Sequence, residues 1–228
     1  MYISLVVYNS CYNVNKTKFN HTYKQTNKQS INHVSTYHSN RKRYPTFPKE
    51  WDLIAAASNI TTEQMAFLIR HSSGYVCAPM SNEYADKLDL PLMRDNLKCV
   101  SNADDRHGTA YTITVDAAEG TTTGISAHDR GLTCRTLAQS TSKPTDFLKP
   151  GHICPLRAAD NGVLQRRGHT EAAVDLCKLS GLPPVGVICE LVNDDEQGTM
   201  MRLNNCVEFG KKFNIPIITI EDLAQYIK

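Results

Sequence analysis

The sequence lacks several features that would assign it at once to a class of protein. None of its eight cysteines lies in a CxxC pair, and several sit within apolar runs, so we expect reduced, buried thiols rather than a disulfide framework or a zinc site. No apolar run reaches the roughly 18 residues of a membrane-spanning helix. The net charge of +2 is too small to indicate binding to nucleic acid or to a membrane surface.

Acidic residues are missing from residues 1–46, which are rich in Asn, Lys, Thr, Ser, Tyr and His. After a short apolar start at residues 3–8, no period of 2 or 3.6 is sustained, which predicts that most of this segment is disordered. A mitochondrial transit peptide is the alternative, although Arg41 and Arg43 are the only arginines of the segment. We therefore expect a tail at 1–46 and a folded domain at 47–228.

The domain alternates predicted strands and helices. Thr61 and Gln64 have the spacing of a capping box at the start of a helix. Strands are predicted at 75–79, 111–116, 153–157, 185–191 and 215–220, and helices at 61–74, 82–87, 129–139, 169–181, 206–213 and from 221 onward. The alternation predicts a layered α/β or α+β domain and leaves the strand order open.

The stretch 166–171 combines arginines, an imidazole, a hydroxyl and a carboxylate where a loop turns into a helix. Free backbone N–H groups and a partial positive charge at a helix start favour an anion there. Arg166 and Thr170 are suited to hold a phosphate, and His169 to be a metal ligand or a proton carrier. The alternative is a charged surface helix with an incidental histidine.

The loop at 120–126 contains two glycines around three threonines and precedes a helix. Such a loop is suited to cradle a phosphate or a sugar. It matches no P-loop or dinucleotide fingerprint, and Gly and Thr are also ordinary turn residues, so both interpretations stay open.

Five longer stretches together resemble one enzyme family, that of 3,4-dihydroxy-2-butanone 4-phosphate synthase. They are residues 65–74, 124–130, 150–158, 166–173 and 187–191, and the resemblance runs from about Asp52 to the C-terminus. It implies a lyase of riboflavin biosynthesis with a layered α/β sandwich fold, a mixed sheet with helices packed on it. The enzyme would be a cytoplasmic homodimer, with a mitochondrial or nuclear fraction as the alternative, and would convert ribulose 5-phosphate to formate and 3,4-dihydroxy-2-butanone 4-phosphate with Mg²⁺, or with Mn²⁺.

The resemblance also implies roles for individual residues. His169 corresponds to a magnesium ligand, and His152 and Glu190 correspond to a pair required for activity. Glu190 also lies at the end of a predicted buried strand, where open α/β sheets place their sites. Four residues correspond to substrate-binding positions: Asp52, Arg166, Thr170 and Glu190.

The chain departs from the family pattern just before Asp52. The family has an acidic loop there, whereas Phe47 stands at its substrate-binding arginine, Pro48 at its metal-binding glutamate and Trp51 at its glycine. Glu50 is a candidate substitute for the metal-binding glutamate. Because similarity ends abruptly inside a motif, an altered 5′ exon is one interpretation. The alternative function is therefore a catalytically impaired homologue, or a misassembled gene model, that binds sugar phosphate or a partner without turnover.

Overall fold

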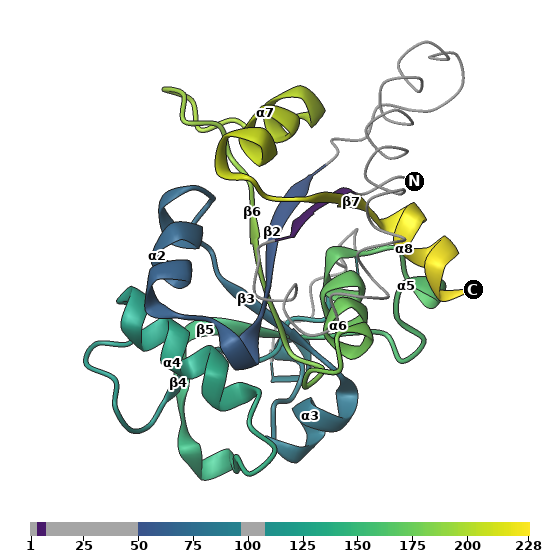
Figure 1. Ribbon diagram of the computed structural model, residues 1–228. Coiled ribbons are helices and arrows are strands. Elements are labelled where there is room, and N and C mark those ends of the chain that lie inside the picture. The colour runs from purple at the N-terminus through teal and green to yellow at the C-terminus, as the bar shows by residue number, and fades with distance from the viewer. Residues whose placement is uncertain (1–3, 8–49, 97–107) are drawn as a thin grey trace.

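The computed structural model describes residues 4–7, 50–96 and 108–228, and its centre is a mixed sheet (Figure 1). Within these residues the sheet has seven strands in the order β4-β5-β3-β6-β2-β1-β7. The pairs β1–β2 and β3–β5 are parallel, and the other neighbours are antiparallel. The strands are β1 (Ser4–Val7), β2 (Trp51–Ala56), β3 (Cys77–Met80), β4 (Val115–Ala117), β5 (Phe147–Arg157), β6 (Gly186–Glu190) and β7 (Ile217–Thr219).

Helices cover both faces of this sheet, as the predicted layered sandwich requires. In Figure 1, α2 and α4 lie on one side of β2, and α6 and α8 lie on the other. The helices are α2 (Thr62–Arg70), α3 (Asn82–Lys87), α4 (Ala127–Leu137), α5 (Gly162–Gln165), α6 (His169–Leu179), α7 (Leu203–Phe213) and α8 (Ile220–Ile227), with short 3-10 turns at Ala57–Asn59, Met93–Asn96 and Pro144–Asp146.

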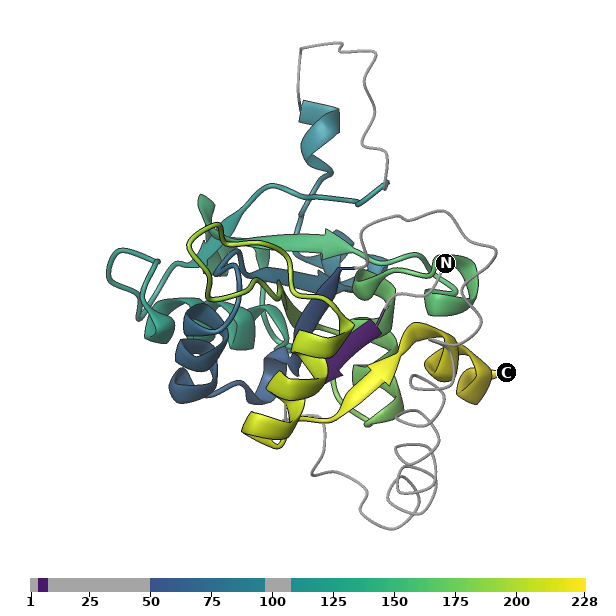
Figure 2. The ribbon, with the colours of Figure 1, turned by 90° about the horizontal axis from the view of Figure 1, so that it is seen from above.

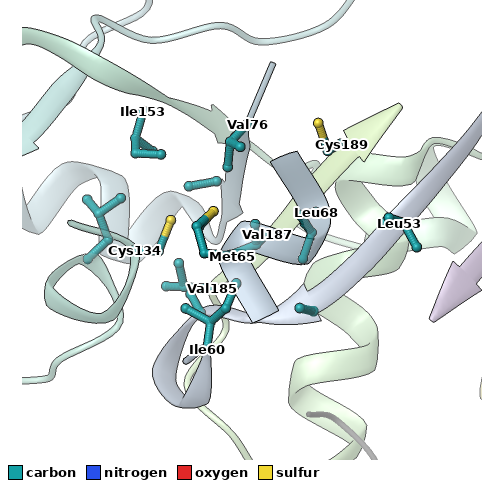
Figure 3. Close-up of a cluster of buried hydrophobic side chains, with 14 of the residues drawn as sticks. Leu53, Ile60, Met65, Leu68, Val76, Cys134, Ile153, Val185, Val187 and Cys189 are labelled. Carbon is teal, nitrogen blue, oxygen red and sulfur yellow. The ribbon is translucent and has the colours of Figure 1, made fainter. Parts of the chain in front are cut away.

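Alternation along β2 explains the two cores. Leu53 points into the cluster beneath α2, α4 and α7, whereas Ile54 points into the cluster beneath α6 and α8. Met65 and Leu68 of α2 pack in the first cluster together with strand side chains such as Val187 (Figure 3). Burying a side chain of this size stabilises the fold by about 1.5–3 kcal/mol.

The second cluster holds α6 close to the sheet. A Cβ atom on Gly186 of β6 would lie 2.8 Å from the Cβ of Ala173, so only glycine permits this approach. Ala172 and Ala173 are fully buried against Ile54 and Ile188. The position of α6, and with it the position of the first turn of the helix, is therefore fixed relative to β2 and β6.

Local signals in the sequence account for most element boundaries. Thr61 and Gln64 form the predicted capping box, with Thr61 N–H to Gln64 Oε1 at 2.9 Å and Gln64 N–H to Thr61 Oγ1 at 3.2 Å. The strand predicted at 111–116 is reduced to Val115–Ala117, with an isolated bridge between Tyr111 and Leu156, and β5 begins earlier than predicted. The short helix α5 was not predicted.

The N-terminal expectation differs from the structure at four residues. Ser4–Val7 forms β1, which lies between β2 and β7 in the sheet, as Figure 2 shows. A short apolar segment can complete a sheet once a neighbouring strand supplies its register, and no sequence period announces this. The rest of the predicted tail, and the boundary at 46 and 47, lie outside the described residues.

Two further expectations concern the whole chain. Six cysteines in the described part of the chain are buried thiols that form no disulfide (Cys77, Cys134, Cys154, Cys177, Cys189 and Cys206), and Cys11 and Cys99 lie outside it. Among the helices that the structure describes, none is long and apolar enough to cross a membrane.

Candidate active site

Two carboxylates face each other where β2 begins and β6 ends. The antiparallel register pairs Asp52 with Glu190, and both follow the alternation of Ile54 and Ile188 toward the α6 side of the sheet. Ser73 fixes the end of β6, since its N–H donates to the Glu190 carbonyl at 2.7 Å and its hydroxyl to Glu190 Oε2 at 3.1 Å. Like charges on facing positions repel, so this pair is suited to a cation or a shared proton.

His169, the first residue of α6, lies directly on this pair. Its Nδ1 atom is 3.1 Å from Asp52 Oδ2, and the side chains are 11% and 2% exposed. A carboxylate only accepts, so Nδ1 carries a proton, and in the neutral ring Nε2 presents a lone pair. Within the described residues, neither His169 Nε2 nor Asp52 Oδ1 has a hydrogen-bond partner, although both are buried.

The ionisation of these groups reflects a concentration of negative charge. Burial by itself lowers the pKa of His169, but the charge and hydrogen bond of Asp52, helped by Glu50 and Glu190, outweigh it and raise that pKa above its ordinary value. Burial, together with the charge of Asp52, raises the pKa of Glu190. A partnerless imidazole nitrogen beside carboxylates is the donor chemistry of a metal site with a carboxylate–histidine pair.

The donor set is nevertheless short in the part of the chain that the structure describes. There, no group of three His, Cys, Asp or Glu side chains is close enough together to hold a metal ion. Glu50, the candidate substitute, is exposed, and Phe47 and Pro48 lie outside the described residues. What fits a cation among the described residues is the pair of buried atoms without a partner, His169 Nε2 and Asp52 Oδ1, and further ligands would be needed to complete its coordination.

Arg166 is held across the start of α6 by a buried carboxylate. Its Nη1 donates to Glu171 Oε2 at 2.6 Å, and Glu171, 1% exposed, also accepts from the Ala159 N–H at 3.0 Å. A Cβ atom on Gly168 would lie 2.2 Å from Arg166 Nη1, so the glycine makes room for the pair. Thr170 is buried in the same turn, and no side chain caps this helix end. The arrangement presents a cation and a helix N-terminus to an anion.

His152 lies on β5 and is paired with a different aspartate. Asp116 accepts from His152 twice, with Oδ2 2.7 Å from Nδ1 and Oδ1 2.8 Å from the backbone N–H. Strand register places His152 and Glu190 at the same edge of the sheet. Cys77 of β3 pairs with one residue of β5 and one of β6, and His152 and Glu190 each lie two residues from that paired residue, toward the same edge. Two interstrand spacings, about 10 Å, separate them.

The loop at 120–126 packs against this second pair. Asp129 of α4 accepts from the Thr122 N–H at 3.0 Å, the Thr122 hydroxyl at 2.8 Å and the Gly124 N–H at 3.1 Å. His128, followed by these Thr122 contacts, lowers the pKa of Asp129. Since two backbone donors of the loop are engaged by Asp129, the loop functions as a fixed turn rather than as an open cradle.

The structure thus gathers most, but not all, of the predicted residues. Asp52 faces Glu190 across the β2–β6 pair and contacts His169, and Arg166 and Thr170 flank His169 along the chain. His152 stands apart by two strands. The sequence alone predicted no role for Ser73, Asp116 or Glu171. Ser73 and Glu171 lie in motifs that resemble the family, and Asp116 lies at the end of a predicted strand.

Comparisons with known proteins identify the family that this chain resembles. The family model described as 3,4-dihydroxy-2-butanone 4-phosphate synthase matches residues 47–226. The synthase of Saccharomyces cerevisiae is 78% identical over 179 residues, covering 78% of this chain and 86% of the yeast protein, and that of Candida albicans is 63% identical over 178 residues, covering 78% and 84%.

Solved structures give the same result. A crystal structure of the Candida albicans synthase has a TM-score of 0.70 at 60% identity, covering 78% of this chain and 84% of that one. A crystal structure of a 3,4-dihydroxy-2-butanone 4-phosphate synthase in complex with two magnesium ions has a TM-score of 0.71 at 49% identity, covering 77% and 83%.

Proposed function

The chain belongs to the 3,4-dihydroxy-2-butanone 4-phosphate synthase family, and from that membership we propose that Asp52, His169 and Glu190 form the centre of its active site. It is a lyase of riboflavin biosynthesis. The family's reaction converts ribulose 5-phosphate to formate and 3,4-dihydroxy-2-butanone 4-phosphate. The observation that carries the site proposal is the partnerless, buried Nε2 of His169 beside two facing carboxylates.

The reaction requires groups that accept and return protons. The substrate loses protons next to a carbonyl, sheds water, rearranges its skeleton and expels one carbon as formate. Glu190 suits one of these roles because burial and the charge of Asp52 raise the pKa of its carboxylate, which makes it a stronger base than an ordinary carboxylate. His152 suits another, since Asp116 occupies Nδ1 and leaves Nε2 for the proton.

A divalent cation completes the site in this proposal. His169 would hold the ion, with Glu50 as the substitute for the glutamate absent at Pro48. When bound, Mg²⁺, or Mn²⁺ in its place, polarises carbonyl and hydroxyl oxygens as a Lewis acid. Asp52 orients the His169 ring through Nδ1 and raises its basicity.

Arg166 and Thr170 bind the ribulose 5-phosphate in this account, with Asp52 and Glu190 contacting it at the sheet. Arg166 is 31% exposed, so its guanidinium reaches solvent while Glu171 fixes one of its nitrogens. The positive end of α6 favours the charge of a phosphate at the same place.

We further propose a homodimer whose interface helps to form the site. Three exposed apolar side chains support this, since Tyr75, Ile125 and Leu148 are each more than half exposed and belong to segments that adjoin His152. Exposed apolar side chains gathered beside a functional residue are typical of an interface. The buried thiols of the described residues form no disulfide, which supports a reducing compartment, so we assign the enzyme to the cytoplasm.

The second candidate, a catalytically impaired homologue, is favoured by one observation. Trp51, at the position of a loop glycine in the family, is 1% exposed, and its Nε1 has no partner among the described residues. A bulky side chain buried there restricts the backbone next to Glu50, the candidate ligand. A chain that binds the sugar phosphate and releases no formate would fit this arrangement.

Formate release from ribulose 5-phosphate separates the two candidates. The chain is compared with a variant carrying Phe47→Arg, Pro48→Glu, Lys49→Asn and Trp51→Gly, and with the same variant retaining Trp51. Restoring a carboxylate ligand worth about 4 kcal/mol would raise Mg²⁺-dependent turnover about a thousandfold. Equal activity in all three would show that Glu50 already serves as the ligand. No turnover in any of them would favour the impaired homologue.

A further inference from the structure

Both carboxylate oxygens of Asp116 contact the same residue, His152. Oδ1 accepts from the His152 backbone N–H at 2.8 Å, and Oδ2 lies 2.7 Å from His152 Nδ1. The Asp116 side chain is 9% exposed, whereas the His152 side chain is 42% exposed. A buried carboxylate therefore fixes the inner side of a ring whose outer side reaches solvent.

The surrounding backbone leaves little space for another arrangement. A Cβ atom on Gly124, where φ is +87°, would lie 2.1 Å from Asp116 Oδ2 and 2.5 Å from His152 Nδ1. A Cβ atom on Gly151 would lie 2.1 Å from the Val115 carbonyl carbon. Because Asp129 fixes the Gly124 N–H, the loop forms a wall that confines the ring and the carboxylate.

This geometry determines where the imidazole proton lies. An ionised carboxylate has no proton to donate, so in the neutral ring Nδ1 is the protonated nitrogen and Nε2 the bare one. We propose that Asp116 is a positioning residue that holds His152 in its Nδ1–H tautomer and so keeps Nε2 ready to take a proton. The proposal rests on the acid–base role proposed for His152, and extends it to the residue that maintains it.

Asp116→Asn tests the tautomer directly. The His152 N–H still requires an acceptor at Oδ1, so the asparagine amide group must face Nδ1 and donate to it. The ring is then forced into the Nε2–H tautomer, with its shape and contacts retained. Nitrogen-15 NMR of the histidine side chains in the full chain, with His152 assigned by the loss of its signals in His152→Gln, should show protonated Nδ1 in the wild type and protonated Nε2 in the variant.

The same variant has a kinetic signature. If a positioned acid–base group contributes the usual 10²–10⁴-fold, kcat for formate release should fall by about a hundredfold or more while KM changes little. In the His152→Gln background, Asp116→Asn should add almost nothing, because Asp116 acts only through that ring. A purely structural role would instead give additive losses and a matching fall in thermal stability.

The chain offers a matched control in Asp175. This carboxylate is 9% exposed, accepts the Val163 N–H at 2.8 Å, and lies 2.1 Å from the Cβ that a substitution would add to Gly162, where φ is +54°. Asp175→Asn should lower the melting temperature about as much as Asp116→Asn and leave kcat and the His152 tautomer unchanged.

Two results would overturn the proposal. One is a wild-type spectrum with His152 protonated at Nε2. The other is a kcat loss in Asp116→Asn no larger than in Asp175→Asn. The NMR result needs no turnover, so it stands even where the proposed enzyme activity of the chain fails, and the kinetic comparison can be made in the restored-loop variant.

Discussion

Two histidine–aspartate pairs lie along one edge of the sheet. They differ in how many of their polar side-chain atoms have a hydrogen-bond partner. In the α6 pair, His169 with Asp52, one carboxylate oxygen and the outer ring nitrogen are buried without a partner among the described residues. In the β5 pair, His152 with Asp116, both carboxylate oxygens are engaged. The first histidine is 11% exposed and the second 42% exposed.

This difference in hydrogen bonding suggests that the two histidine–aspartate pairs have different roles. Buried polar atoms are almost always hydrogen-bonded, so two atoms at one place without a partner among the described residues support the ligand proposed there. In a pair whose carboxylate oxygens both have hydrogen-bond partners, no further ligand is required, and an exposed ring can exchange a proton with a substrate. The α6 pair therefore fits a static ligand position, and the β5 pair fits a proton carrier.

Asp52→Asn should have the largest effect on metal affinity. The amide still accepts from His169 Nδ1 but removes the charge that raises the basicity of the ring. Second-shell changes of this kind weaken metal binding about 10–100-fold. Titration with Mn²⁺ followed by electron paramagnetic resonance measures the change, with Asp116→Asn as the control. If both variants lost affinity equally, the distinction between the pairs would be wrong.

Leu148→Glu tests whether the β5 pair lies at an interface between subunits. A charge replacing a leucine buried there removes about 1.5–3 kcal/mol of apolar burial, so the dimer dissociation constant should rise at least tenfold. Sedimentation should show a shift toward the 25.5 kDa mass of one chain. Leu179→Glu, at a comparably exposed leucine on α6, should leave the mass unchanged. A wild-type mass of one chain at micromolar concentration would contradict the proposed dimer.

Glu171→Gln tests substrate binding at the start of α6, separately from the two histidine–aspartate pairs. It weakens the charge-assisted hydrogen bond that fixes Arg166, which is about one-third exposed. We expect KM for ribulose 5-phosphate to rise about tenfold, or ~1.4 kcal/mol, with kcat nearly unchanged. Asp86→Asn removes the charge from a similar pair, with Arg157, whose carboxylate is exposed, and should change neither constant. A fall in kcat alone would place Glu171 in the chemistry instead.

Thr61→Ala should have the smallest effect and should spare both pairs. It removes the capping box of α2, which lies on the opposite face of the sheet from α6. Denaturant unfolding should show a loss of about 1 kcal/mol, with metal affinity and formate release unchanged. A change in either activity would mean that α2 transmits strain to the site.

The sequence predicted what depends on local chemistry. Thr61 and Gln64 marked a helix start that the structure confirms, and the alternation of strands and helices predicted a layered sandwich. The cluster of Asp52 with Glu190 required the register of two strands about 140 residues apart, which no local pattern specifies. The resemblance to a family supplied those residues instead.

The partners of the histidines were not predictable for the same reason. Asp116 appeared in the sequence only as the residue that ended a strand, and its contact with His152 arises from pairing between β4 and β5 across a bulge. β1 is a further example, since Ser4–Val7 acquires its place only through pairing with β2 and β7.

The most direct test measures metal affinity and turnover together in His169→Gln and His152→Gln. The account predicts that His169→Gln loses both Mn²⁺ binding and formate release, because it removes the partnerless nitrogen. His152→Gln should lose formate release by about a hundredfold or more and bind Mn²⁺ as the wild type does. Equal loss of metal affinity in the two variants, or full turnover in His152→Gln, would contradict the assignment of one pair to the metal and the other to the proton.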